Sequence, residues 1–335
     1  MFLRVNFLEI LGTALAYNKQ RLEMKLEVIG LKKEYRNCIA VDNLSFTIET
    51  GEITGFIGPN GAGKTTTMKL ITNNESCSDG DIKLDGISIL EYPELIREHI
   101  GYIPDFLPSN KDMTVHDYLD FFANAYGFKN TERHEIVKIL EDFTNLTNVN
   151  GKIIDTLSKG MKQRVSIARA LISNPEFILM DEPASGLDPR ERIELRYLLK
   201  NLRENGKGIF ISSHILSELS EICTYTVIIE KGKLIKSGKV ENIIEEVSNK
   251  SNRIFQMETL SAPTEEVINK ISSKPLVSNI TVIGNTLEFK YSGTDDQLAE
   301  LVNELLDEGI HFTSFSFKKD NLESVFMNVT KGIVQ

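Results

Sequence analysis

The chain has 335 residues, 41% hydrophobic and 26% charged, a globular composition with more length than one compact core usually takes, so two domains are expected. The 38 Lys and Arg residues against 48 Asp and Glu give a net charge of -10, which disfavours capture of nucleic acid or of an anionic membrane surface. No window approaches the run of about 18 apolar residues that marks a spanning helix. Three widely separated cysteines, Cys38, Cys77 and Cys223, suggest neither a zinc framework nor a disulfide scaffold and fit a reducing cytosol.

Residues 1–24 are expected to form an N-terminal extension outside the fold. Their apolar residues weakly resemble a secretory signal, but Asn6 and Glu9 interrupt the apolar core that such a signal needs. Apolar residues at helical spacing make an amphipathic segment a second alternative. We favour a third interpretation, in which Met24 is the translation start and the preceding residues are an upstream extension.

Residues 25–238 alternate short apolar runs with helical patterns, as an α/β sheet with crossover helices requires. A helix is predicted from Asp188, a capping residue followed by Pro189 at the first helical position, to Gly206. From about residue 92 to 174 the pattern becomes helical, which predicts an inserted helical subdomain. Buried strands are predicted at residues 53–57, 177–180, 208–211 and 226–229.

Residues 239–335 are predicted to form a small α+β accessory domain. Strands at 253–258, 277–283, 286–291 and 310–317 alternate with helices at 264–271 and 295–307. The order β-α-β-β-α-β is typical of a ferredoxin-like fold. In the last strand Ile310 and Phe312 share one parity and Phe315 and Phe317 the other, so a β-bulge is expected between them.

The strongest local signal follows the expected strand at 53–57 and precedes a helical run. It is a complete GxxxxGK[ST] pattern: Gly58-Pro59-Asn60-Gly61-Ala62-Gly63-Lys64-Thr65-Thr66. Glycines let backbone N–H groups turn around phosphate oxygens, Lys64 adds a positive charge, and Thr65 offers a hydroxyl to Mg²⁺. A coincidental glycine-rich turn is the alternative, and the order of strand, loop and helix disfavours it.

Two carboxylates end the expected strand at 177–180. Asp181 is suited to hold Mg²⁺, and Glu182 to polarise a water aimed at a γ-phosphate. Acidic residues after a buried strand often only begin a solvated loop. Together with a phosphate-binding loop, the pair instead indicates a nucleoside triphosphatase.

With these motifs in place, residues 26–238 resemble the nucleotide-binding subunit of an ATP-binding cassette (ABC) transporter. The resemblance implies an ABC-type P-loop ATPase domain of the α/β class, with a mixed sheet core and an inserted helical subdomain. It also implies that Tyr35 packs under adenine and that His214 is the switch histidine. The matching segments are Leu157-Ser158-Lys159-Gly160-Met161 for the family signature, Ser185-Gly186-Leu187-Asp188 for its D-loop and Ser212-Ser213-His214 for the switch.

The family mechanism is a dimer, here expected to be a homodimer, that encloses two ATP molecules. Each ATP lies between the phosphate-binding loop of one subunit and the signature of the other. The signature residues Ser158, Lys159, Gly160 and Met161 would then contact the ATP of the opposite subunit. Asp188 would join the two sites, while Glu182 and His214 would be the catalytic residues.

The sequence departs from the common family pattern at three positions. Lys159 replaces a signature glycine, Met161 replaces a signature glutamine, and Asp105 stands where most relatives carry a glutamine that touches Mg²⁺. A carboxylate can also bind Mg²⁺, so the expected metal ligands are Thr65, Asp105 and Asp181. These features resemble the bacterial branch of two-component exporters, which implies an integral-membrane permease partner and a peripheral location at the cytoplasmic face of the membrane.

Two alternatives stay open. A soluble ABC ATPase without a permease is one, although relatives that act on ribosomes or DNA carry a second cassette or long coiled coils. A regulatory module that only binds ATP is the other, and Glu182 and His214 argue against it because both hydrolytic groups are present. No nucleic acid partner is expected, and the transported substrate is not encoded in these motifs.

Overall fold

The computed structural model describes residues 23–105, 112–215, 219, 221–247 and 253–317. The expected N-terminal extension therefore lies outside the described residues, apart from its last two positions. The chain divides into two compact units after Val240, where the sequence places a boundary after residue 238.

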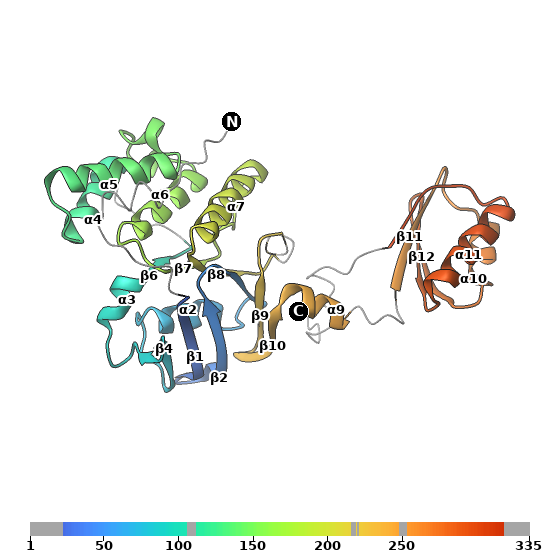
Figure 1. Ribbon diagram of the computed structural model, residues 1–335, viewed down its shortest axis with the longest axis horizontal. Helices are drawn as coiled ribbons and strands as arrows, with labels where there is room; N and C mark the ends of the chain where they lie inside the picture. Colours follow the sequence, from blue (N-terminus) through green and yellow to red (C-terminus); the bar gives the residue numbers. More distant parts are fainter. Residues whose placement is uncertain (1–22, 106–111, 216–218, 220, 248–252, 318–335) are drawn as a thin grey trace. The chain divides into compact units, whose positions relative to one another are not determined.

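The first unit is built on a six-stranded mixed sheet (Figure 1). Every residue of its three central strands is buried, because these strands are short, apolar and covered on both faces. All neighbouring strands run parallel except the first pair, so the expected mixed sheet of a P-loop ATPase is confirmed. In spatial order the strands are β10 (Lys233–Lys239), β9 (Tyr225–Glu230), β3 (Ile53–Ile57), β8 (Gly208–Ser213), β7 (Phe177–Asp181) and β6 (Ile100–Ile103).

A second sheet of the same unit is antiparallel, and the sequence analysis named none of its strands. The rings of Phe46, Phe56 and Phe210 join the two sheets, with centroids 4.9 to 5.6 Å apart. Its strands, in the order β2-β1-β4-β5, are β1 (Lys25–Tyr35), β2 (Cys38–Glu49), β4 (Asp79–Leu84) and β5 (Ile87–Ser88).

The stretch predicted to be helical at 92–174 also contains strand β6. This strand pairs with β7, which buries its residues Ile100 and Ile103 in the main sheet. The predicted helical subdomain is therefore not continuous over residues 92–174. None of the helices in the described residues is long and apolar enough to span a membrane. The helices of the unit are α2 (Lys64–Ile71), α3 (Glu94–His99), α4 (Val115–Ala125), α5 (Asn130–Phe143), α6 (Lys159–Leu171) and α7 (Pro189–Glu204), with the 3-10 turns η1 (Thr147–Val149) and η2 (Ile154–Thr156).

The second unit confirms the ferredoxin-like expectation. Its antiparallel sheet has the order β12-β13-β11-β14, and both helices lie on one face of it (Figure 1). A register shift between Phe312 and Ser314 of the last strand is the expected bulge. After α9 (Val240–Val247) the elements are β11 (Arg253–Thr259), α10 (Glu265–Ser272), β12 (Val277–Ile283), β13 (Thr286–Tyr291), α11 (Asp295–Asp307) and β14 (Phe312–Phe317).

Candidate functional site

Four parallel strands of the main sheet deliver the motif residues to one edge. Strand β3 leads into the loop at 58–66, β7 ends in Asp181 and Glu182, β8 leads into His214, and β6 leads into Asp105. Because the carboxyl ends of parallel strands meet at one edge of a sheet, these residues lie in one neighbourhood, where ligands bind in open α/β sheets.

The loop at 58–66 accepts only glycine at two of its turns. A Cβ at Gly58 would stand 2.6 Å from the carbonyl oxygen of Ile229, and one at Gly63 would stand 2.5 Å from that of Ala40. Gly63 also has a φ of 105°, which side chains rarely adopt. The close backbone packing at these glycines shapes a loop of the kind that surrounds phosphates with N–H groups.

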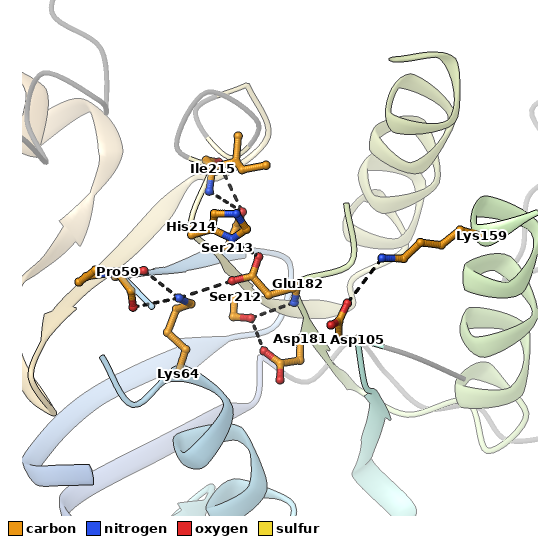
Figure 2. Close-up of polar contacts among 11 residues, drawn as sticks. Pro59, Lys64, Asp105, Lys159, Asp181, Glu182, Ser212, Ser213, His214 and Ile215 are labelled. Atoms are coloured by element: carbon orange, nitrogen blue, oxygen red, sulfur yellow. Dashed lines mark hydrogen bonds and ion pairs between the residues drawn. The ribbon is translucent and has the colours of Figure 1, made fainter. Parts of the chain in front are cut away.

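The Lys64 ammonium lies inside this loop (Figure 2). Its Nζ donates to the carbonyl oxygens of Gly58, at 2.7 Å, and Pro59, at 3.3 Å, and lies 3.4 Å from Oε1 of Glu182. The side chain is 6% exposed. A buried cation held by carbonyl groups at the mouth of a glycine loop is suited to receive phosphate oxygens.

The Glu182 carboxylate lies between two motif side chains. Its Oε2 is 2.8 Å from Nδ1 of His214, and its Oε1 faces Lys64 (Figure 2). The backbone of Glu182 has a φ of 49°, in the left-handed region that is costly for a residue with a side chain. The structure thus brings Glu182 into direct contact with both Lys64 and His214.

Ser212 holds this arrangement, and the sequence analysis assigned it no role. The pairing of β7 with β8 places Ser212 beside Asp181. Its Oγ donates to Oδ1 of Asp181, at 2.5 Å, and accepts the N–H of Glu182, at 2.9 Å. Its position two residues before His214, at the end of an apolar strand, was the available sequence signal.

Tyr35 lies at the end of β1 and is 45% exposed. Its hydroxyl donates to Glu75, and this hydrogen bond, with some burial, raises the pKa of Tyr35. Glu75 in turn lies 3.7 Å from Nζ of Lys33 and 3.5 Å from that of Lys69. The Lys33 ammonium stands 5.1 Å from the ring centroid, so one ring face is covered by a cation while the ring is fixed by its hydroxyl.

The signature residues lie where helices α6 and α7 begin. Ser158 caps α6, since its Oγ accepts the N–H of Met161 at 3.2 Å, and it donates to Oε1 of Glu191 at 2.9 Å. Asp188 caps α7 in a capping box with the same Glu191. The spacing Asp188-x-x-Glu191 is a recognisable capping-box signal that the sequence analysis did not use.

Two of the unusual motif residues contact each other. Nζ of Lys159 lies 3.9 Å from Oδ1 of Asp105 (Figure 2). The Lys159 side chain also passes close to Gly186. Burial, with the Asp181 and Asp105 carboxylates nearby, raises the pKa of Tyr102 to about 12. Within the described residues, Asp105 therefore has the Lys159 ammonium as its ion-pair partner, at 3.9 Å.

The donor set fits Mg²⁺ held together with phosphates. Thr65 and Asp181 offer the hard oxygen atoms that this ion prefers, and Thr65 is exposed at the start of α2. No group of three or more His, Cys, Asp or Glu side chains in the described part of the chain could hold a metal by itself. Mg²⁺ commonly binds through one or two carboxylates plus substrate phosphates, which is the arrangement these residues permit.

Comparisons with known proteins show which family the chain is similar to. The family described as ABC transporter matches residues 41–185. The linearmycin resistance ATP-binding protein LnrL of Bacillus subtilis (strain 168) is 30% identical over 91% of this chain and 98% of its own length. The Nod factor export ATP-binding protein I of Mesorhizobium japonicum is 31% identical over 91% of this chain and 86% of its own.

Solved structures give the same result for the fold. The structure of an ATP binding subunit of an ABC transporter has a TM-score of 0.60 and 30% identity, and covers 67% of this chain and 93% of its own. The structure of cbiO1 from Clostridium perfringens, part of the ABC transporter complex cbiONQ, has a TM-score of 0.58 and 27% identity over 67% of this chain and 94% of its own.

Proposed function

Because the chain belongs to the ABC transporter ATP-binding proteins, as an ATP-binding subunit of exporter type, we propose that it hydrolyses ATP between two copies of itself to drive a separate membrane permease. The observation that carries the proposal is the contact of Glu182 with both Lys64 and His214 at the mouth of the glycine loop. We assign residues 25–238 as the nucleotide-binding domain and residues 239–335 as the accessory domain.

In the proposed reaction, the loop at 58–66 and Lys64 bind the ATP phosphates, and Tyr35 stacks against adenine. Glu182 is the general base that accepts a proton from the attacking water, and His214 orients that water and the γ-phosphate. Ser212 fixes the backbone N–H of Glu182, so the base is already oriented before ATP binds. In this way the two catalytic groups come from the ends of neighbouring parallel strands.

Mg²⁺ would supply charge neutralisation on the β- and γ-phosphates when bound. Thr65 and Asp181 are the proposed ligands from the loop and from β7. Asp105 is the proposed third ligand, and Lys159, its partner in this structure, is then a competing cation.

The proposed dimer places Ser158, Lys159, Gly160 and Met161 against the ATP of the opposite subunit. Support comes from Ser158 and the start of α6, which together form a hydroxyl and a set of N–H groups suited to a γ-phosphate. Asp188 lies beside them as the capping residue of α7, and we propose that it joins the two sites across the interface between copies.

A permease partner at the cytoplasmic face of the membrane is proposed from the ABC transporter family match and from the export name of the Mesorhizobium japonicum relative. A net charge of -10 disfavours binding to nucleic acid or to an anionic membrane surface, so we propose that a protein partner holds the chain at the membrane. Neither the soluble ATPase nor the regulatory module has a specific observation in its favour.

The test is turnover of ATP by two variants at equal protein concentration. Glu182→Gln should bind ATP like the parent and lose about hundredfold or more in turnover, because the base is lost while the phosphate loop is kept. Lys64→Ala should instead lose ATP affinity. Full turnover in Glu182→Gln, or unchanged ATP affinity in Lys64→Ala, would overturn the assignment.

A further inference from the structure

One carboxylate serves the starts of two helices in this fold. Oε2 of Glu191 accepts the N–H of Asp188, at 3.4 Å, and the Glu191 N–H donates to Oδ1 of Asp188, at 2.8 Å, which closes the capping box of α7. Oε1 of the same residue accepts the hydroxyl of Ser158, at 2.9 Å, at the start of α6. Glu191 therefore links the residue that caps α6 to the residue that caps α7.

The carboxylate also lies directly against the backbone of α6. A Cβ built on Gly160 would overlap Cδ and Oε1 of Glu191, so no residue with a side chain fits there while Glu191 keeps this position. Gly160 itself is buried. This close approach gives a reason for glycine at position 160 within the chain itself: it makes room for an acidic side chain.

The Ser158 hydroxyl has one hydrogen, and it donates that hydrogen in the hydrogen bond to Glu191. The oxygen of the same hydroxyl accepts the N–H of Met161. A phosphate oxygen is only an acceptor, so Ser158 can donate to a phosphate only after it leaves Glu191. In addition, the negative charges of a phosphate and of Glu191 repel each other at the same pair of helix N-termini.

We propose that Glu191 is a positioning residue that holds Ser158 in the free subunit and competes with the γ-phosphate of the ATP brought by a second subunit. This inference rests on the proposed ATP-dependent pairing of two subunits. When a phosphate oxygen accepts the hydrogen bond from the Ser158 hydroxyl, Oε1 of Glu191 loses its donor. Oε2 of Glu191 keeps its hydrogen bond with the N–H of Asp188.

The experiment compares dimer formation in variants that cannot hydrolyse ATP. Glu182→Gln and the double variant Glu182→Gln/Glu191→Gln are titrated with ATP, and molar mass is measured by light scattering after size exclusion. Glutamine keeps the length of Glu191 and one acceptor oxygen but loses the charge. The ATP concentration for half-maximal dimer formation should therefore fall by about threefold or more. The melting temperature without ATP should stay near that of the Glu182→Gln parent.

A matched control neutralises a carboxylate one turn further along α7. Glu194 pairs with Arg164 of α6, so Glu182→Gln/Glu194→Gln removes a charge between the same two helices without touching Ser158. Its ATP requirement should equal that of the parent. In a Ser158→Ala background the change at Glu191 should lower the ATP requirement by clearly less, because only the direct charge repulsion remains once the hydroxyl is gone.

Each outcome separates the two proposals. If Glu182→Gln stays monomeric at saturating ATP, the proposed pairing of subunits is wrong. If it dimerises but the change at Glu191 leaves the ATP requirement unchanged or raises it, the competition is wrong. An equal shift in the Ser158→Ala background or in the Glu194 control would show a general charge effect and would also overturn the role assigned to Glu191.

Discussion

Ser212 is fully buried, and its single hydroxyl contacts both acidic residues at the end of β7. Donation to Asp181 and acceptance from the Glu182 N–H tie the Asp181 carboxylate to the backbone of Glu182. Glu182 has a left-handed backbone, which costs free energy unless neighbouring groups hold it. The serine thus has a positional role although it need not touch ATP.

We predict that Ser212→Ala lowers turnover by roughly tenfold to hundredfold, since a hydrogen bond to a charged group contributes about 1.5 to 3 kcal/mol. ATP affinity should stay near that of the parent, because the glycine loop is unchanged. The measurement is turnover against ATP concentration. Ser166→Ala is the matched control: Ser166 is also buried, and its hydroxyl has no hydrogen-bond partner in the described part of the chain, so turnover should be kept. Equal loss in both variants would refute the positional role.

Asp105 is an ion-pair partner of Lys159 in this structure, and the proposed role as a Mg²⁺ ligand competes with that contact. If it binds Mg²⁺, Asp105→Asn should raise the Mg²⁺ concentration for half-maximal turnover with little change in melting temperature, because a neutral amide is a weaker ligand for a hard cation. Lys159→Met should lower that concentration, since it removes the competing cation 3.9 Å away. An unchanged Mg²⁺ requirement in both variants would leave Asp105 with the ion pair as its role.

Among single residues, the sequence predicted the motif residues and missed those that fix them by hydrogen bonds. Lys64, Glu182 and His214 stand in recognisable motifs, and the structure places Glu182 in contact with the other two; their roles stay predictions. Ser212 and Glu75 act through side chains distant in sequence, Asp181 and Tyr35, and no local pattern marks such pairs. Glu191 could have been found from its capping-box spacing, but its contact with Ser158 depends on how α6 packs beside α7.

Among the elements, the buried strands were the easiest to predict. β3 spans residues 53–57 as expected, because it is a continuous apolar run. β12, β13 and α11 also begin and end as the sequence indicated, since Gly284 and Asn285 separate the two strands and Thr294 caps the helix. β1 and β2 were missed because bulges break their alternation of buried and exposed residues. β6 was assigned to a helical region because four residues give too short a pattern to distinguish from its helical neighbours.

Strand β11 is the centre of the second unit. Phe255 is 4% exposed and its ring contacts those of Phe289, Tyr291 and Phe315. We predict that Phe255→Ala destabilises this unit by about 3 to 5 kcal/mol, as the loss of a core phenylalanine usually does. ATP turnover at low temperature should stay near that of the parent, because the residue lies outside the first unit.

The measurement for Phe255 is thermal unfolding by calorimetry. The control is Leu260→Ala in the same unit, where the side chain is 73% exposed and the expected change is within about 0.5 kcal/mol. If Phe255→Ala lowers the unfolding temperature of both units together, or if turnover is lost at low temperature, the accessory domain supports the catalytic one.

For the whole molecule, the division into two compact units separates chemistry from an accessory fold. Every proposed catalytic, ATP-binding and signature residue lies before Val240, and the ferredoxin-like unit has a core of its own. The expected fold class followed from patterns that are local in sequence. The proposed assembly of two copies does not follow from the contacts within one chain, because in that proposal ATP and a second chain complete its surfaces.

The central claim is that ATP joins two copies of this chain. The most direct measurement is the molar mass of Glu182→Gln by size exclusion with light scattering, with and without saturating ATP and Mg²⁺. The predicted result is a monomer of 37.8 kDa without ATP and twice that mass with it, returning to monomer when ATP is removed. A variant that binds ATP and stays at the monomer mass at every ATP concentration would contradict the account.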